Sequence, residues 1–244
     1  MGAALARQER PEPGACEPRI SVVIPALDER DALPRALEST RGPGVERIVV
    51  DGGSADGTPE VARAAGAEKV IRAAPGRARQ LDAGCREASG DVIVFLHADT
   101  RLDPGWPDAI RAALRDRAVA GGAFRLAFRS RRAVYRWLEL WVRLRSRLAG
   151  LPFGDQALFV RRELIVAEGG IPPVAIFEDL DLVRLIRRRG RLALLPERAW
   201  TSTRRYERNG VLRQGLRNHA ATLAWLLGVD RDRVAGWYRR RARR

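Results

Sequence analysis

The stretch DVIVFLHADT, residues 91–100, contains the pattern that decides the fold. Its five consecutive apolar residues, VIVFL, are typical of a strand that is buried on both faces of a parallel sheet. The apolar run then stops at His97, Ala98 and Asp99. In open α/β sheets ligands bind beyond the carboxyl ends of the strands, so we expect this imidazole and this carboxylate to face a ligand.

Strands and helices alternate around this stretch through the first half of the chain. Apolar runs predict strands, and apolar residues at helical spacing predict helices. The predicted strands are residues 19–26, 45–53, 68–73 and 91–96, and the predicted helices are residues 30–40, 58–67, 76–90 and 103–116. This alternation indicates an α/β fold with a mostly parallel sheet flanked by helices.

The second half is less regular. It contains predicted strands at 119–130, 154–162 and 191–196, and predicted helices at 131–150, 178–190, 210–228 and 230–244. We therefore expect a disordered leader at 1–18, one α/β domain at 19–205 and a helical C-terminal extension at 206–244. The leader lacks the long apolar core of a secretory signal, and no apolar run approaches the ~20 residues of a membrane span.

The chain is strongly basic, with a net charge of +15, and Lys69 is its only lysine. Two interpretations stay open, namely a compositional bias toward arginine, or an anionic partner such as a nucleotide, a phospholipid surface or a nucleic acid. Cys16 and Cys85 are the only cysteines and form no C-x-x-C pattern, so neither a disulfide framework nor a zinc site is indicated. A reducing, cytoplasmic location is the default expectation.

Acidic residues follow several predicted core elements. Asp51 ends a strand in IVVDGGSADGT, Glu29 follows one in IPALDER, and Glu178 and Asp179 begin a helix. Each has an ordinary structural interpretation, as a turn residue or as a first-turn charge that complements the helix dipole. Acids that converge on one sheet edge are nevertheless costly unless a cation or a catalytic role accounts for them. Asp99 either caps a helix or binds a divalent cation that bridges phosphates.

Together these loops resemble family 2 glycosyltransferases of the GT-A fold. The matching pieces occur in the order of the family within residues 19–190, and they are SVVIPALDER, IVVDGGSADGT, GRARQLDAG, DVIVFLHADT, GDQALFVRR and FEDLDLVRLIRRRG. The short length and RRYERNG near the end resemble the compact subgroup of radical-SAM/selenodomain-associated transferases. The resemblance implies a UDP- or GDP-sugar donor, an unidentified hydroxyl acceptor and a divalent cation, Mg²⁺ or Mn²⁺.

The resemblance also implies roles for individual residues. Those expected to bind the nucleotide sugar are Pro25, Ala26, Glu29, Asp51, Arg77, Gln80, Ala98, Asp155, Gln156, Arg204 and Arg205. Among them, Asp51 would hold the base, whereas Arg204 and Arg205 would neutralise the diphosphate or would be ordinary solvated arginines.

The Asp-x-Asp metal motif of the family falls on His97, Ala98 and Asp99, so a histidine replaces its first acid. Asp99 would carry the metal, and His97 would bind it, contact the ribose or do neither. The late acidic motif falls on Glu178 and Asp179. One of these two would be the general base of an inverting transfer, and the motif position favours Asp179.

Two other functions fit parts of the sequence. A nucleotidyltransferase shares a similar fold, but the loop after its first strand is usually rich in glycine and contains Lys or Arg. The corresponding loop here, IPALDER, has neither Gly nor Lys. A nucleic-acid-binding protein would need arginines on one face interleaved with exposed aromatic side chains, whereas the charge here is diffuse. We therefore expect no nucleic-acid partner.

The predicted helix at 131–150 has Trp137, Trp141, Leu144 and Leu148 on one side and many arginines on the other. Basic amphipathic helices can lie on anionic membranes. The preferred interpretation is an ordinary helix that packs its tryptophans on the sheet. We thus expect at most a weak, salt-sensitive peripheral contact with the inner face of the membrane.

Overall fold

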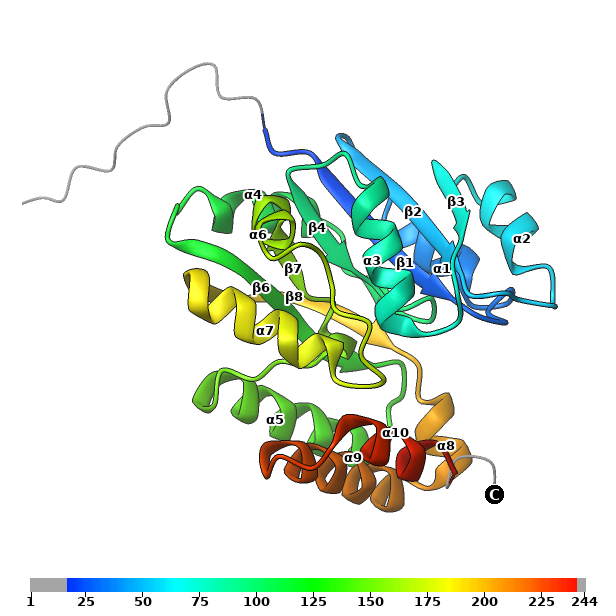
Figure 1. Cartoon of the computed structure of the whole chain (residues 1–244), viewed down its shortest axis with the longest axis vertical. Helices are drawn as coiled ribbons and strands as arrows, with labels where there is room; N and C mark the ends of the chain where they lie inside the picture. Colours follow the sequence, from blue (N-terminus) through cyan, green and yellow to red (C-terminus); the bar gives the residue numbers. More distant parts are fainter. Residues whose placement is uncertain (1–16, 241–244) are drawn as a thin grey trace, which may run out of the picture.

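The computed structural model describes residues 17–240, so the predicted leader at 1–18 lies almost entirely outside the described residues. The described chain forms one eight-stranded sheet in the order β3-β2-β1-β4-β7-β6-β8-β5 (Figure 1). The strands are β1 (Ile20–Ala26), β2 (Val45–Asp51), β3 (Lys69–Arg72), β4 (Val92–Phe95), β5 (Arg101–Leu102), β6 (Val119–Phe128), β7 (Phe159–Arg161) and β8 (Arg191–Thr201).

The first four strands, β1 to β4, are parallel to one another, and their register brings their carboxyl ends together. Ala26 at the end of β1 pairs with Asp51 at the end of β2, and Val23 of β1 pairs with Phe95 of β4. The loop that contains His97 therefore lies next to the end of β1. β7 is antiparallel to β4 and β6, whereas β6 and β8 are parallel. The predicted α/β class with a mostly parallel sheet is confirmed.

Helices cover both faces of the sheet because the strand side chains are apolar on both sides. Val22 and Val23 of β1, for example, belong to the two different core clusters. One face is covered by α1 (Leu33–Ser39), α2 (Thr58–Ala64) and α4 (Trp106–Leu114). The other face is covered by α3 (Arg77–Glu87), α6 (Arg162–Ala167) and α7 (Glu178–Arg189).

The remaining helices gather beyond the carboxyl ends of the first four strands (Figure 1). They are α5 (Ala133–Leu148), α8 (Arg204–Asn209), α9 (Val211–Leu226) and α10 (Arg231–Arg240). Trp225 of α9 fixes this group to α7, since its ring lies 5.7 Å from the Phe177 ring and 3.8 Å from the Arg184 guanidinium carbon. Arg231 of α10 also pairs with both carboxylate oxygens of Asp181 in α7. The C-terminal helices are thereby docked on the segment that contains the predicted base.

Several predicted elements differ from the structure. The strand predicted at 154–162 is only β7, because Gly154–Gln156 form a 3₁₀ turn. The helix predicted at 76–90 ends at Glu87, and the strand predicted at 191–196 continues to Thr201. The short elements β5, α6 and α8 were not expected. The predicted boundary between residues 205 and 206 falls inside α8 and stays a prediction.

The expectation that the α5 tryptophans pack on the sheet is wrong. Trp137 is 60% exposed and Trp141 is 45% exposed. The helix instead packs through its other side, where Tyr135 and Leu138 are buried. The described helices include none that is long and apolar enough to cross a membrane.

Candidate active site

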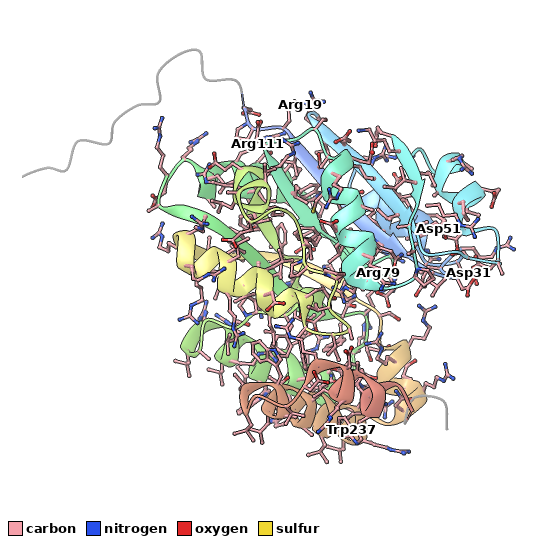
Figure 2. The ribbon with its side chains drawn as sticks, viewed as in Figure 1. Arg19, Asp31, Asp51, Arg79, Arg111 and Trp237 are labelled. Atoms are coloured by element: carbon pink, nitrogen blue, oxygen red, sulfur yellow. The ribbon has the colours of Figure 1, made fainter. Side chains whose placement is uncertain are left out.

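A cavity of about 660 Å³ opens where β1 and β4 end. Ten of the residues predicted to bind the nucleotide sugar or the metal line it, and they are Pro25, Ala26, Glu29, Arg77, Gln80, His97, Ala98, Asp99, Arg204 and Arg205. In Figure 2 the labelled Asp51, Asp31 and Arg79 lie toward the end of the sheet that faces the C-terminal helices, and Arg19 and Arg111 lie toward the opposite end. The structure therefore brings together residues from four separate segments, namely the end of β1 with its loop, the start of α3, the loop after β4 and the start of α8.

The loops on the β1 and β2 side hold one another through side-chain hydrogen bonds. The Gln80 side-chain amide donates to the carbonyl oxygens of Ala26 and Val50, both at 2.9 Å. Asp51 does not line the cavity, because its buried carboxylate accepts from the backbone amides of Gly53 and Ser54 at 3.0 and 3.1 Å. The predicted contact between Asp51 and the base stays a prediction, and the observed contacts shape the loop.

His97 and Asp99 lie in the cavity wall after β4. The His97 Nε2 atom is buried and has no hydrogen-bond partner. Burial, with smaller contributions from the charges of Arg77 and Arg205, holds the pKa of His97 well below its usual range. A neutral imidazole with an unused nitrogen and a carboxylate are both donors that a divalent cation accepts.

These two residues fit a shared cation site and not an all-protein cage. Among the described residues, no group of three or more His, Cys, Asp or Glu side chains is arranged to hold a metal ion. Mg²⁺ usually takes only one or two carboxylates from the protein and completes its shell with water and substrate phosphates. The residues present therefore suit a cation that is held jointly with a diphosphate.

Arg204 connects α8 to the loop after β1. Its Nη2 atom lies 2.8 and 2.7 Å from the two carboxylate oxygens of Glu29, and 3.9 Å from Asp99 Oδ2. The hydrogen bond to Glu29 is the main reason that the pKa of Arg204 is raised. Arg204 thus connects residues 175 positions apart at the cavity, although its side chain is 58% exposed. Its predicted role toward the diphosphate stays a prediction.

The predicted catalytic acids form a second group beside the cavity. Arg77 connects the two, since it lines the cavity and its Nε atom lies 2.9 Å from Glu178 Oε1. The Asp179 carboxylate accepts from the backbone amides of Gly154 at 2.8 Å and Leu180 at 2.9 Å. Gly154, the first residue of the 3₁₀ turn, also lies close to Arg77, since the Arg77 guanidinium would have to shift to admit a Cβ atom at this position.

Two carboxyl groups in this second group resist ionisation. Burial raises the pKa of Asp155 most, and nearby Asp179 adds to the rise while Arg145 opposes it. Burial likewise raises the pKa of Glu178, against the opposing charge of Arg77. Phe177, just before α7, has a left-handed φ of 68°. Asp155, Gln156, Glu178 and Asp179 do not line the cavity itself, so their predicted roles stay predictions.

Sequence reasoning missed the part of the cavity wall that comes from the C-terminal helices. These residues are Arg208, Asn209, Gln214, Arg217 and Tyr238. The sequence contains only a weak signal for them, namely polar residues that interrupt an apolar helix. Their position depends on how Trp225 and Arg231 dock α9 and α10 on α7, which no local pattern encodes.

A model of the glycosyl transferase family 2 matches residues 21–161, more than half of the chain. The chain belongs to this family. An uncharacterized glycosyltransferase of Mycobacterium tuberculosis is 33% identical over 179 residues, which cover 69% of this chain and 62% of that protein. Three other mycobacterial glycosyltransferases match over only 39% of their length, so the chain spans about two fifths to two thirds of these curated relatives.

Solved structures of glycosyltransferases share the fold. A mannosyltransferase from Pyrobaculum calidifontis in complex with GDP-Man and Mn²⁺ has a TM-score of 0.65 at 21% identity, over 85% of this chain and 62% of that one. Glucosyl-3-phosphoglycerate synthase from M. tuberculosis with Mn²⁺, UDP and glucosyl-3-phosphoglycerate has a TM-score of 0.61 at 24% identity, over 87% and 81%. The predictions of a GT-A fold and of an enzyme are confirmed, and family membership decides against a nucleotidyltransferase.

Proposed function

We propose that this glycosyltransferase moves a sugar from a nucleoside diphosphate sugar to a hydroxyl acceptor, with a divalent cation and with inversion at the anomeric carbon. The observation that supports this most is the cavity at the ends of β1 and β4, which gathers ten residues predicted to bind the donor or the metal from separate segments of the chain. The fold relatives in complex with GDP-Man and Mn²⁺, and with UDP and Mn²⁺, support the same class of donor and of cation.

In this proposal Asp99 and His97 hold the cation together with the donor diphosphate. The cation, Mg²⁺ or Mn²⁺, would neutralise the negative charge that develops on the leaving diphosphate. Arg204 and Arg205 add positive charge at the same wall of the cavity. Pro25, Ala26 and Ala98 would pack against the nucleotide, because they line the cavity with little side chain between the backbone and the ligand.

The acceptor hydroxyl oxygen would attack the anomeric carbon from the face opposite the diphosphate. Its proton passes to the carboxylate of Asp179, a new C–O bond forms, and the bond between the anomeric carbon and the diphosphate oxygen breaks. The two backbone amides bound to Asp179 fix the direction of its carboxylate. Glu178 orients Arg77 through their ion pair, and Asp155 and Gln156 help to position the donor sugar or the acceptor.

Calorimetric titration with UDP and GDP, with and without Mn²⁺, tests this function. We expect one nucleotide to bind more tightly with Mn²⁺, and the Asp99→Ala variant to lose that metal-dependent gain while its melting temperature stays near the wild-type value. Asp108→Ala is the matched control, because Asp108 lies on α4 outside the cavity with its side chain 81% exposed. Full metal-dependent binding by Asp99→Ala would contradict the assignment of the cation site.

A membrane contact is the second part of the proposal, and it rests on the exposed apolar face of α5 and α9. This face consists of Trp137, Leu140, Trp141, Leu144, Leu148, Leu212, Leu216, Leu223 and Leu226, each at least 43% exposed. The two helices meet where Trp141 Nε1 and His219 Nε2 lie 2.9 Å apart. Exposed apolar side chains gathered on two adjoining helices mark an interaction surface.

The charges beside this face favour an anionic bilayer as its occupant. Arg143 and Arg147 follow one flank of the α5 stripe at helical spacing, whereas Arg136 on the same flank pairs with Glu139 at 2.7 Å. The single acid of α5, Glu139, is buried, and α9 contains no acid. A second copy of the chain would place arginines against arginines, whereas anionic lipids attract basic residues by ~1 kcal/mol each. The cytoplasmic location that the cysteines suggest stays a prediction.

Vesicle sedimentation tests the membrane contact. We expect binding to vesicles that contain phosphatidylglycerol, little binding to pure phosphatidylcholine, and release by salt. Trp137→Ser should weaken the binding severalfold. Val166→Ser is the control, because Val166 is equally exposed but lies on α6. Equal binding to both kinds of vesicle, or binding to neither, would contradict the proposal.

A further inference from the structure

Three arginines line the cavity without a carboxylate partner among the described residues. They are Arg205, Arg208 and Arg217, which come from α8 and α9. The other two arginines of the cavity differ, because Arg77 pairs with Glu178 and Arg204 pairs with Glu29. The C-terminal wall of the cavity thus has positive charge that the described chain does not neutralise.

Arg217 is the most informative of the three, because it is only 8% exposed. Its Nε and Nη2 atoms are buried and have no hydrogen-bond acceptor, and its guanidinium carbon lies 4.4 Å from the centroid of the Tyr238 ring. A buried guanidinium without an acceptor costs free energy, which a bound anion would offset. The stacking on Tyr238 holds the planar group in a fixed orientation.

A network of side-chain hydrogen bonds supports this wall. The Asn209 amide donates to Gln214 Oε1 at 2.7 Å, and the Gln214 amide donates to Asn218 Oδ1 at 2.7 Å. The Tyr238 hydroxyl donates to the same Asn218 oxygen at 2.8 Å. The side-chain oxygens of Gln214 and Asn218 therefore accept from their neighbours and not from Arg217. The Arg217 Nε and Nη2 groups remain free to donate to a ligand. Preorganised donors lose little entropy when an anion binds.

We propose that Arg208 and Arg217 form a subsite for a phosphate group carried by the acceptor. This inference rests on the proposed function, in which the donor diphosphate is held by the cation at Asp99 and by Arg204 and Arg205. The subsite belongs to α8 and α9 and not to the strand-end loops, so it offers a second anion a separate place. Arginine suits a phosphate because its planar N–H groups bind two oxygens at once. The phosphate belongs to a soluble phosphate monoester or to a lipid headgroup.

The test is a calorimetric titration of the full chain, already saturated with Mn²⁺ and the tighter-binding nucleotide. The probes are glycerol phosphate, a soluble monoester, and monomeric dodecyl phosphate. We expect both probes to bind the wild-type protein, and binding to weaken about tenfold in Arg208→Gln and in Arg217→Gln. Arg208 is exposed, so its variant keeps the test valid if loss of the buried Arg217 side chain impairs folding.

Arg213→Gln is the matched control, because Arg213 lies on the same helix, one turn before Arg217, and does not line the cavity. It should bind both probes as the wild type does. Much tighter binding of dodecyl phosphate than of glycerol phosphate would identify a lipid source, and equal binding would identify a soluble one.

Three results would overturn the subsite: no probe binding by the wild type, an equal loss in Arg213→Gln, or an equal weakening of nucleotide binding in Arg208→Gln. The last result would mean that the arginines hold the donor diphosphate. The same titration without nucleotide separates the two proposals. If no nucleotide binds, the proposed donor function fails, while probe binding by the free protein still decides the subsite.

Discussion

The two sides of the cavity differ in how their polar groups are satisfied. On the side of β1 and β2, Asp51 accepts from backbone amides of its own loop and Gln80 donates to carbonyl oxygens at the ends of both strands. These bonds connect residues within the first 80 positions. On the side of the C-terminal helices, Arg217 has buried N–H groups without an acceptor, and α5 and α9 expose apolar faces. On the first side the hydrogen-bond partners come from the chain itself. On the second side a ligand would have to accept from the Arg217 N–H groups, and another surface would have to cover the apolar faces.

The largest expected effect concerns the acid group between these two sides. Asp179→Asn should lower the rate of nucleoside diphosphate release by about 10²–10⁴-fold, because a general base acts in the transition state. Donor affinity should stay nearly unchanged, since the carboxylate is expected to contact the acceptor and not the nucleotide. Steady-state release assays, combined with nucleotide titration, separate these two quantities.

Thermal unfolding of Asp179→Asn is the necessary control, because the carboxylate also binds the amides of Gly154 and Leu180. A variant that melts normally but binds the donor poorly and keeps its turnover would show that the base lies elsewhere. Glu178 would then be the next candidate, because it occupies the same first turn of α7 and pairs with Arg77.

The same difference between the two sides explains what the sequence could predict. Asp51 and the His97–Asp99 stretch belong to short motifs at strand ends, and Gln80 belongs to a motif at the start of α3. Parallel strands place their carboxyl ends at one end of the sheet. The position of Arg217 depends instead on Trp225 docking against Phe177 and Arg184. Such a contact between distant segments leaves no local pattern in the sequence.

The α5 helix shows the opposite error, in which a local pattern was found but its partner was assigned wrongly. The spacing of Trp137 and Trp141 correctly predicted one apolar side of a helix. Periodicity does not say whether that side faces the core, and here Tyr135 and Leu138 are buried while the tryptophans are exposed. An apolar stripe therefore predicts a contact surface but not which partner covers it.

The second prediction weakens the completed side of the cavity. Gln80→Met removes the amide that joins the carbonyl oxygens of Ala26 and Val50 at the ends of β1 and β2. The cost should be about 1–2 kcal/mol in the free energy of unfolding, because two buried hydrogen bonds are lost while the Ala26 carbonyl still accepts from the Gly52 amide. Nucleotide affinity should fall as well, since Ala26 lines the cavity. Denaturant unfolding and calorimetry measure the two effects, and an unchanged free energy of unfolding would contradict the structural role of Gln80.

The last prediction applies the same substitution, Asp to Asn, to two carboxylates. One is Asp51 on the β1 and β2 side of the cavity, and the other is Asp155 in the acid group beside the cavity. Asp51 is buried and accepts from two backbone amides, whereas the Asp155 Oδ1 atom is buried without a partner. Asp51→Asn should destabilise the protein by about 1 kcal/mol, because an amide nitrogen then faces a backbone N–H. Asp155→Asn should instead stabilise it near neutral pH, because the substitution removes a charge that burial disfavours.

The pH dependence of this stabilisation follows from the direction of the Asp155 pKa shift. Burial raises the pKa of Asp155 above its usual value of 3.8, so the folded wild type binds this proton more tightly than the unfolded chain does. Wild-type stability is therefore lost progressively as the pH rises from 3.8 toward the raised folded pKa, and Asp155→Asn escapes that loss. Melting curves at pH 4 and pH 7 should show the gain of Asp155→Asn over wild type at pH 7 and a much smaller gain at pH 4. Two results would contradict this prediction: an equal gain in melting temperature at both pH values, or a lower melting temperature of Asp155→Asn at pH 7. Either would mean that Arg145 compensates the Asp155 charge, so that this acid is as well satisfied as Asp51.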